Sequence, residues 1–427
     1  SSLAKDDWGM PGFIESDCDA VGDLLDKYHL ATTKEEASAI AIHARTDLDC
    51  GHTYKGLVDA EDVDDDTIRS AFHNAMRPLF LQGLFDPDTY ALYSGDDEMA
   101  ALLDDHRALA LESSYQSLVL LKNDHDALPL NKDDTNDVAL IGPLGFVREQ
   151  LVGPITIGPC AATTENPGLL GGGYKEDYGC VPTLNETLQP AYWSPGAENI
   201  TSTSDAFIDE AIAAAKKADV VVFALGAGLE TVDETDDLRN LSLPGIQNDL
   251  VKRVVEATRG NDERRYVVVL VMGNQYAVDA FVQDVDAVLN AFIPSSTTAS
   301  KVIVDALYGS PDVRFGKLPY TMYHDAYSAV VDIADMSFAN RGYRYYDGDL
   351  VSFPFGFGLS YTTFHLGGAT LDEGLLLRVK VSNVGDRDGD EVVQLYLRPV
   401  DVTTGAPLPL KKLIDFDRVS VDAGATE

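Results

Sequence analysis

The sequence of 427 residues has few cysteines, few basic residues and no long apolar run. Its four cysteines are too few for a fold built on disulfides, and they lack the CxxC spacing typical of a metal site. The 32 lysine and arginine residues are outnumbered by 70 aspartate and glutamate residues, so the formal net charge is −38. Such a surface repels phosphate groups and anionic lipids, which argues against binding to nucleic acid or to a membrane surface. An uncharged or cationic partner is easier to accommodate.

The longest apolar runs, 218–229 and 266–273, have the length of buried strands and are shorter than the ~18 residues of a membrane span. The chain begins Ser-Ser-Leu-Ala, without an initiator Met or a signal segment. We therefore expect a chain that was processed, truncated or cut from something longer. Its hydrophobic content of 45% is that of a globular protein. At roughly 100–200 residues per domain, the length allows two to four domains.

Strands and helices are expected to alternate over most of the chain. Residues 12–16 read as a short strand that runs into a polar turn, and 46–51 as another strand end. Residues 33–46 and 63–83 have the apolar spacing of helices, and this alternation is typical of a parallel α/β unit. Residues 142–203 form a loop-rich stretch. A second series of elements follows. Apolar strands are predicted at 118–122, 138–142, 219–225, 266–272 and 285–290. Helices are predicted at 105–118, 205–217, 245–258 and 297–308. Because these strands are almost wholly apolar, we predict an α/β domain whose mostly parallel sheet is covered on both faces.

After about residue 365 the pattern changes. Segments 375–383 and 391–398 alternate apolar and polar residues, with a turn rich in Gly and Asp between them. This pattern predicts an antiparallel β-sandwich that begins near residue 370 and ends at Glu427 with too few strands.

Asp17 is the first candidate for chemistry. It follows an expected parallel strand, where α/β folds place reactive side chains. A turn that merely caps a helix is the other interpretation that its position allows. Residues 17–21 also match the DxDx(T/V) pattern of haloacid-dehalogenase-like phosphatases, which use an Asp nucleophile with Mg²⁺. Those enzymes need a later acidic pair at a strand end, whereas the acidic run 64–66 opens a helix, and the chain's charge would repel a phosphorylated substrate.

The second candidate is the acidic loop that follows the apolar strand ending near residue 226. Its carboxylates would repel one another and raise some of their pKa values, as a general acid requires. These carboxylates belong to Glu230, Asp233, Glu234, Asp236 and Asp237. A solvated acidic loop is the other interpretation. One strand-end carboxylate as nucleophile and another as acid/base would make a retaining glycosidase, with the two carboxyl groups ~5–5.5 Å apart.

Several motifs resemble those of glycoside hydrolase family 3, specifically its β-xylosidase branch. They keep the family's order and approximate spacing across almost the whole chain, and they lie at 12–21, 46–51, 119–130, 139–143, 243–245, 316–319 and 353–362. The resemblance implies that Asp17 is the nucleophile. It also implies an acid/base glutamate before the Leu-Pro-Gly at 243–245, where counting back places Glu234. Thr235 and Leu238 depart from the family's pattern there, so Glu230 is the fallback.

Cys18 bears on the substrate. It stands where β-glucosidases of the family usually carry Trp, which favours xylosides and places Cys18 at the first sugar subsite. A β-glucosidase or α-L-arabinofuranosidase is the near alternative, and an inactive carbohydrate-binding relative is the alternative of a different class. Cys18 and Cys50 follow neighbouring strand ends and either form a disulfide or remain buried thiols. The implied mechanism is double displacement on an oligosaccharide or polysaccharide, without cofactor or metal.

The resemblance also implies an architecture. Residues 1–100 would be the C-terminal remnant of a (β/α)₈ barrel, 101–325 an α/β sandwich domain, and 326–427 a connecting segment with a truncated fibronectin type III-like domain. Because a barrel needs ~250 residues and 16 residues precede Asp17, we expect a C-terminal portion that is inactive by itself. Glycosylation patterns at Asn185, Asn199 and Asn240 favour a secreted, extracellular protein whose signal peptide lies outside this chain. The sequence leaves the oligomeric state open.

Overall fold

The computed structural model forms two compact units, Ser1–Asp105 and His106–Glu427. The residues that the structure describes are 3–86, 96–131, 137–152, 178–228, 230–231, 238–260, 264–294, 297–332, 334–335, 337–374, 376–400 and 407–427. In this part of the chain, no helix is both long enough and apolar enough to cross a membrane.

The first unit is mainly helical. Its helices are α1 (Ala20–Asp26), α2 (Lys34–His43) and α3 (Asp65–Leu81), with short helical segments at Leu3–Asp7 and Thr53–Val58. The helices predicted at 33–46 and 63–83 are α2 and α3. Each begins at a residue whose side chain accepts a backbone N–H of the first turn, and these residues are Thr33 for α2 and Asp64 for α3.

The strand predicted at 12–16 is not formed. Glu15 makes an isolated parallel bridge with Leu48, so the two predicted strand ends are adjacent, but neither extends into a strand. Two short paired segments are marginal without further strands beside them, and the described part of this unit contains no other strand.

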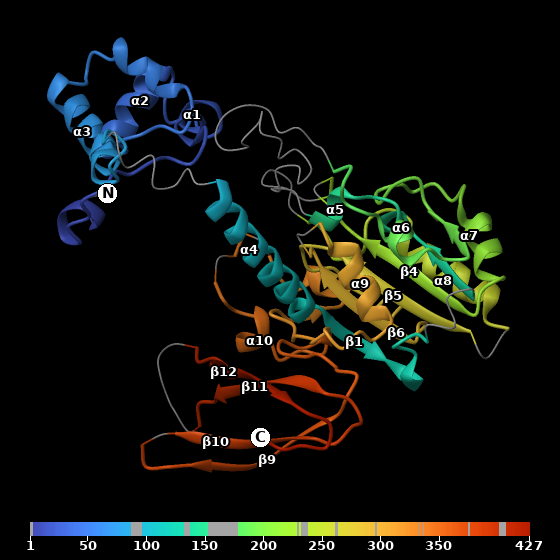
Figure 1. The fold of residues 1–427 in the computed structure, drawn as a ribbon. Helices are drawn as coiled ribbons and strands as arrows, with labels where there is room; N and C mark the ends of the chain where they lie inside the picture. Colours follow the sequence, from blue (N-terminus) through green and yellow to red (C-terminus); the bar gives the residue numbers. More distant parts are fainter. Residues whose placement is uncertain are drawn as a thin grey trace. The chain divides into compact units, whose positions relative to one another are not determined.

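A six-stranded sheet forms the centre of the second unit, in the order β1-β6-β5-β4-β2-β3 (Figure 1). Its strands are β1 (Val119–Asn123), β2 (Val138–Ile141), β3 (Tyr192–Ser194), β4 (Val220–Gly226), β5 (Arg265–Val271) and β6 (Ala287–Phe292). All neighbours pair in parallel except β1, which is antiparallel to β6. The prediction of an α/β fold with a mostly parallel sheet is therefore confirmed. Within the stretch 142–203 that was predicted to be rich in loops, the structure also contains β3, a three-residue edge strand.

Helices cover both faces of this sheet (Figure 1). The helices of the second unit's α/β part are α4 (Asp96–Ser117), α5 (Glu149–Val152), α6 (Leu184–Leu188), α7 (Ile208–Ala215), α8 (Gln247–Thr258) and α9 (Ala299–Leu307), and α4 begins before the division between the units. The residues of α6 and α9 pack on one face, and those of α7 and α8 pack on the other.

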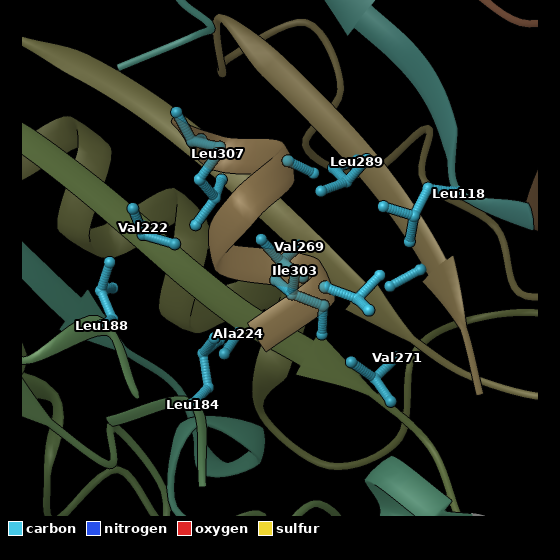
Figure 2. Packing of buried hydrophobic residues seen from close by; sticks show 14 of the residues in the cluster. Leu118, Leu184, Leu188, Val222, Ala224, Val269, Val271, Leu289, Ile303 and Leu307 are labelled. Carbon is cyan, nitrogen blue, oxygen red and sulfur yellow. The ribbon is translucent and has the colours of Figure 1, made fainter. Parts of the chain in front are cut away.

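The strands divide their side chains between two hydrophobic clusters. In β4, Val222 and Ala224 face the cluster that contains α9, whereas Phe223 faces the cluster that contains α8. Figure 2 shows the first cluster, in which Ile303 of α9 lies against Val269 of β5. Successive strand residues point to opposite faces, so a sheet covered on both sides needs apolar residues throughout. Full burial of each such side chain contributes about 1.5–3 kcal/mol.

The C-terminal part of the second unit is built from antiparallel pairs. These pairs are β7 (Met322–Tyr323) with β8 (Val351–Phe353), β9 (Phe364–Leu371) with β10 (Leu377–Asn383), and β11 (Gly389–Leu397) with β12 (Lys412–Val421). The short helix α10 (Gly342–Tyr345) lies between β7 and β8 in the sequence. The alternating pattern after residue 365 therefore marks antiparallel strands. The turn rich in Gly and Asp connects β10 to β11, and these strands belong to different two-stranded sheets.

Candidate active site

Two neighbouring turns position Asp17. The Ser16 N–H donates to the Leu48 carbonyl at 2.9 Å, and the Asp19 N–H donates to the Cys50 carbonyl at 2.6 Å. In the opposite direction, the Cys50 N–H donates to Ser16 Oγ at 3.0 Å. These bonds hold the turn that carries Asp17 against the turn that begins after Leu48.

A disulfide joins the same two turns. Cys18 and Cys50 are bonded, with their Cα atoms 4.3 Å apart, and they are 32 positions apart in the sequence. Of the two alternatives that the sequence leaves open, the structure contains the disulfide. In the chain-entropy description, closing a loop of this length stabilises the folded state by about 4 kcal/mol. The backbone on both sides of Asp17 is thereby tied to a second segment.

The Asp17 carboxylate is exposed at the tip of its turn. Within the described residues, its Oδ1 accepts one hydrogen bond, from the Cys18 N–H at 2.8 Å. The N-cap of α1 is Asp19, in the left-handed region with φ of 62°, and no side-chain capping bond is formed there. The turn therefore does precede a helix, with Asp19 as its N-cap residue, but the Asp19 carboxylate makes no capping bond. An exposed carboxylate held at one oxygen can present the other oxygen to a substrate.

A buried ion pair between Asp47 and Lys5 stabilises the segment that leads to the Asp17 turn. Asp47 is 8% exposed and pairs with Lys5, and both side chains are almost fully enclosed. Asp47 Oδ2 also accepts the Ile14 N–H at 2.8 Å, and Oδ1 accepts the Asn74 amide at 3.0 Å. This network fixes the backbone three residues before Asp17. Our reading of the sequence missed it, because its partners come from separate parts of the sequence.

Asp49 adds a second, half-buried carboxylate. Its Oδ2 accepts the backbone N–H groups of Thr53 and Tyr54 at 2.8 and 3.0 Å, while its buried Oδ1 has no hydrogen-bond partner in the described part of the chain. Burial, together with the negative charges of Asp49 and Asp47, raises the pKa of Tyr54. Tyr54 therefore remains a neutral donor, and its hydroxyl donates to the Thr46 carbonyl at 2.6 Å.

The acid/base candidates belong to the second unit. Glu234, with Asp233 and Asp236, lies outside the described residues. Glu230 is exposed a few residues after β4, and its Oε1 accepts the Gln150 amide at 3.3 Å. Asp17 belongs to the first unit. The separation between nucleophile and acid/base stays a prediction.

Gln247 fixes the ends of the segment that contains the acidic loop. It is fully buried at the start of α8, and its Oε1 accepts the Gly226 N–H at 2.9 Å. Its Nε2 donates to the carbonyls of Gly226, Pro244 and Ile200 at 2.8, 3.1 and 3.1 Å. Gly226 ends β4, and Pro244 belongs to the Leu-Pro-Gly motif. One signal pointed to this residue: Gln247 is three positions before Leu250, on the apolar side of the predicted helix.

The predicted glycosylation sites differ in exposure. Asn199 and Asn240 are exposed, and each side-chain oxygen accepts the backbone N–H two residues later, at 3.1 and 3.2 Å. Asn185 is half-buried within α6, and its Oδ1 is enclosed. Within the described residues, no group of three or more His, Cys, Asp or Glu side chains is arranged to hold a metal ion.

A family model covers more than half of the chain. Residues 118–361 match the glycosyl hydrolase family 3 C-terminal domain. The chain belongs to glycosyl hydrolase family 3. Membership confirms the resemblance, and it excludes the haloacid-dehalogenase-like interpretation of residues 17–21.

The relatives within family 3 include both xylosidases and glucosidases. Probable beta-D-xylosidase 6 of Arabidopsis thaliana is 30% identical, over 98% of this chain and 57% of that protein. The periplasmic beta-glucosidase of Salmonella typhimurium is 30% identical, over 99% of this chain and 58% of that protein. A solved exo-beta-xylosidase of the family, in complex with a xylobiose aziridine activity-based probe, has a TM-score of 0.79 at 26% identity, covering 99% of this chain and 56% of that one. The chain thus spans somewhat more than half the length of these relatives.

Proposed function

We propose that this protein is a retaining exo-glycosidase that removes terminal β-D-xylosyl residues from xylo-oligosaccharides or xylan. The main observation behind the proposal is that Asp17 has an exposed carboxylate, on a turn held by the Cys18–Cys50 disulfide, in a chain of family 3. The xylosidases among the relatives support the substrate. A neutral sugar also suits a chain with a net charge of −38, because it loses no energy to electrostatic repulsion.

The mechanism is double displacement. Asp17 attacks the anomeric carbon to form a glycosyl–enzyme ester, while Glu234 protonates the departing oxygen. Glu234 then takes a proton from water, and the water attacks the same carbon, which releases the sugar and frees the Asp17 carboxylate. Glu230 is the alternative acid/base. Two carboxylates are sufficient for these steps.

A β-glucosidase is the second candidate, and the Salmonella relative favours it. Cys18 favours a xyloside instead, because its sulfur is committed to Cys50 and leaves a small side chain beside Asp17. An α-L-arabinofuranosidase and an inactive carbohydrate-binding protein are the remaining alternatives. Parallel assays of the full-length protein with nitrophenyl β-xyloside, β-glucoside and α-arabinofuranoside separate these four outcomes, and we expect the β-xyloside to be hydrolysed fastest.

Replacement of Asp17 tests the mechanism. Asp17→Ala in the full-length protein should abolish turnover, and azide should restore part of it by attacking the anomeric carbon in place of the carboxylate. Asp26→Ala, which removes another exposed carboxylate after the same turn, is the control and should leave turnover unchanged. Full activity of Asp17→Ala would end the proposal.

The acid/base is tested through the leaving group. Glu234→Ala should slow the hydrolysis of xylobiose far more than that of a nitrophenyl xyloside, because nitrophenolate departs without a proton. Equal losses on both substrates would move the assignment to Glu230.

The architecture and location form a further part of the proposal. Residues 1–100 would be the end of a (β/α)₈ barrel, and 326–427 a connecting segment with a fibronectin type III-like domain. We also propose a secreted glycoprotein, and the exposure of Asn199 and Asn240 supports glycosylation at those two positions. Mass spectrometry after secretion from a eukaryotic host should find glycans there, and unmodified asparagine at both positions would contradict this part.

A further inference from the structure

A cavity of about 540 Å³ lies in the second unit. It is lined by the segment from Gly342 to Phe355 and by residues at the adjoining ends of β11 and β12. The residues used below are Tyr343, Phe355, Arg398, Leu410 and Lys411. The volume is typical of a small-molecule site, which usually measures ~300–1,000 Å³. Neither Asp17 nor Glu230 lines it, so the proposed hydrolysis does not account for it.

The walls of this cavity are fixed to one another. Tyr343 and Phe355 stack with ring centroids 4.1 Å apart and an interplanar angle of 19°. The Tyr343 hydroxyl oxygen accepts the Leu413 N–H at 3.0 Å, and the Leu410 N–H donates to the Arg344 carbonyl at 2.6 Å. The two segments that form the cavity are therefore joined by hydrogen bonds, and the aromatic wall has a defined orientation.

Lys411 is also held in place. Its Nζ lies 4.5 Å from the centroid of the Tyr396 ring, which is the geometry of a cation–π contact. The Tyr396 hydroxyl donates to Gln394 Oε1 at 2.5 Å, and Gln394 Nε2 donates to the Gly356 carbonyl at 2.9 Å. Contact with a ring face leaves the ammonium N–H donors available to a ligand.

The charge of the lining opposes that of the chain. Its described residues include Arg398 and Lys411 and contain no aspartate or glutamate, although acidic residues outnumber basic ones by 70 to 32 in the whole sequence. Arg398 is exposed, and its guanidinium offers five N–H donors in a planar arrangement that matches a carboxylate. A pair of cations beside an apolar aromatic wall fits a ring that carries a carboxylate.

We propose that this cavity, the Arg398–Lys411 pocket, binds an acidic sugar residue of a glycan, namely a pyranose that carries a carboxylate. The carboxylate would contact Arg398 and Lys411, and the apolar face of the sugar ring would lie against the wall formed by Tyr343 and Phe355. The pocket is a non-catalytic site. It goes beyond the proposed function, because removal of a neutral xylosyl residue at Asp17 requires no acidic group.

Binding to the whole 427-residue chain tests the pocket. Isothermal titration would compare a xylo-oligosaccharide carrying one glucuronic acid residue with the same oligosaccharide without it, and we expect the acidic ligand to bind at least about tenfold more tightly. Arg398→Gln and Lys411→Gln should each weaken its binding about tenfold. Lys412→Gln is the matched control, because Lys412 is exposed next to Lys411 and does not line the cavity.

Two further comparisons separate this proposal from its alternatives. Asp17→Ala should bind the acidic oligosaccharide as the parent chain does, so a failure of the glycosidase mechanism would leave this result unchanged. Benzoate is an aromatic carboxylate of similar charge and should bind more weakly than glucuronate. The proposal is overturned by equal affinity for the acidic and neutral ligands, by no measurable binding, by unchanged binding in both glutamine variants, or by tighter binding of benzoate.

Discussion

Gln247 offers a direct test of how the segment containing the acidic loop is held. The change Gln247→Met keeps a long, unbranched side chain of similar volume and removes both polar atoms. It therefore separates the hydrogen bonds of Gln247 from its packing in the core. The parent side chain is fully buried and makes four hydrogen bonds, to the backbone of Gly226, Pro244 and Ile200.

The structure sets the size of the expected effect. The methionine variant leaves one N–H group and three carbonyl groups without their partner in a buried site. The amide group of Gln247 has two N–H donors for these three carbonyl groups, so it makes the equivalent of three full hydrogen bonds in all. A typical intramolecular hydrogen bond contributes about 0.5–1.5 kcal/mol, so the loss should be about 3 kcal/mol. Because small proteins unfold with a free energy of about 5–15 kcal/mol, such a loss should be easy to measure.

Urea unfolding followed by circular dichroism measures this free energy. The midpoint should fall strongly for Gln247→Met. Glu256→Met is the matched control, because Glu256 is exposed on the same helix α8 and its replacement should change stability by less than about 0.5 kcal/mol. A loss below about 1 kcal/mol for Gln247→Met would refute the reasoning, since it would mean that the four backbone groups find other partners.

Three other replacements test the supporting structure by the same unfolding measurement. Asp47→Asn should cost about 3–5 kcal/mol, because it leaves the enclosed Lys5 ammonium without its carboxylate, and adding Lys5→Met should recover part of the loss. Hydrogen bonds from Arg148 hold the pKa of Glu186 at about 2, below its usual 4.5. Glu186→Gln should therefore lower stability at pH 7, by less than about 1 kcal/mol because the pair is half exposed, and this difference should disappear as the pH falls from 4.5 to 2. Ile303→Ala should cost about 2–5 kcal/mol, because it opens a cavity between α9 and the sheet.

The central sheet could be predicted because the sequence pattern of its strands indicates that they are buried. Segments β4 and β5 are apolar at nearly every position, as strands covered on both faces must be. The edge strand β3 carries no such signal, because Trp193 is exposed and Tyr192 is half-buried. The turn that carries Asp17 was also predictable, since polar residues directly follow a short apolar segment.

The supports of the candidate site could not be predicted from local patterns. Asp47 and Lys5 are 42 positions apart, and Asp47 and Asn74 are 27 apart, so no periodicity relates them. The hydrogen bonds of Gln247 could not be predicted for the same reason. Its partners are backbone groups, which every residue has. A pattern reveals which residues are buried, whereas the partner of a buried polar group depends on the completed fold.

The net charge of the sequence also differs from the local charge in the Arg398–Lys411 pocket. A net charge of −38 describes the field that a large polyanion meets from a distance, and it argues against nucleic acid as a partner. At physiological ionic strength this field is screened within about 8 Å. A small acidic group inside the Arg398–Lys411 pocket therefore responds mainly to the nearest charges, and the described charges of the lining are both positive. The composition excludes extended anions from the surface, yet the same chain can bind a single carboxylate where its local charge is reversed.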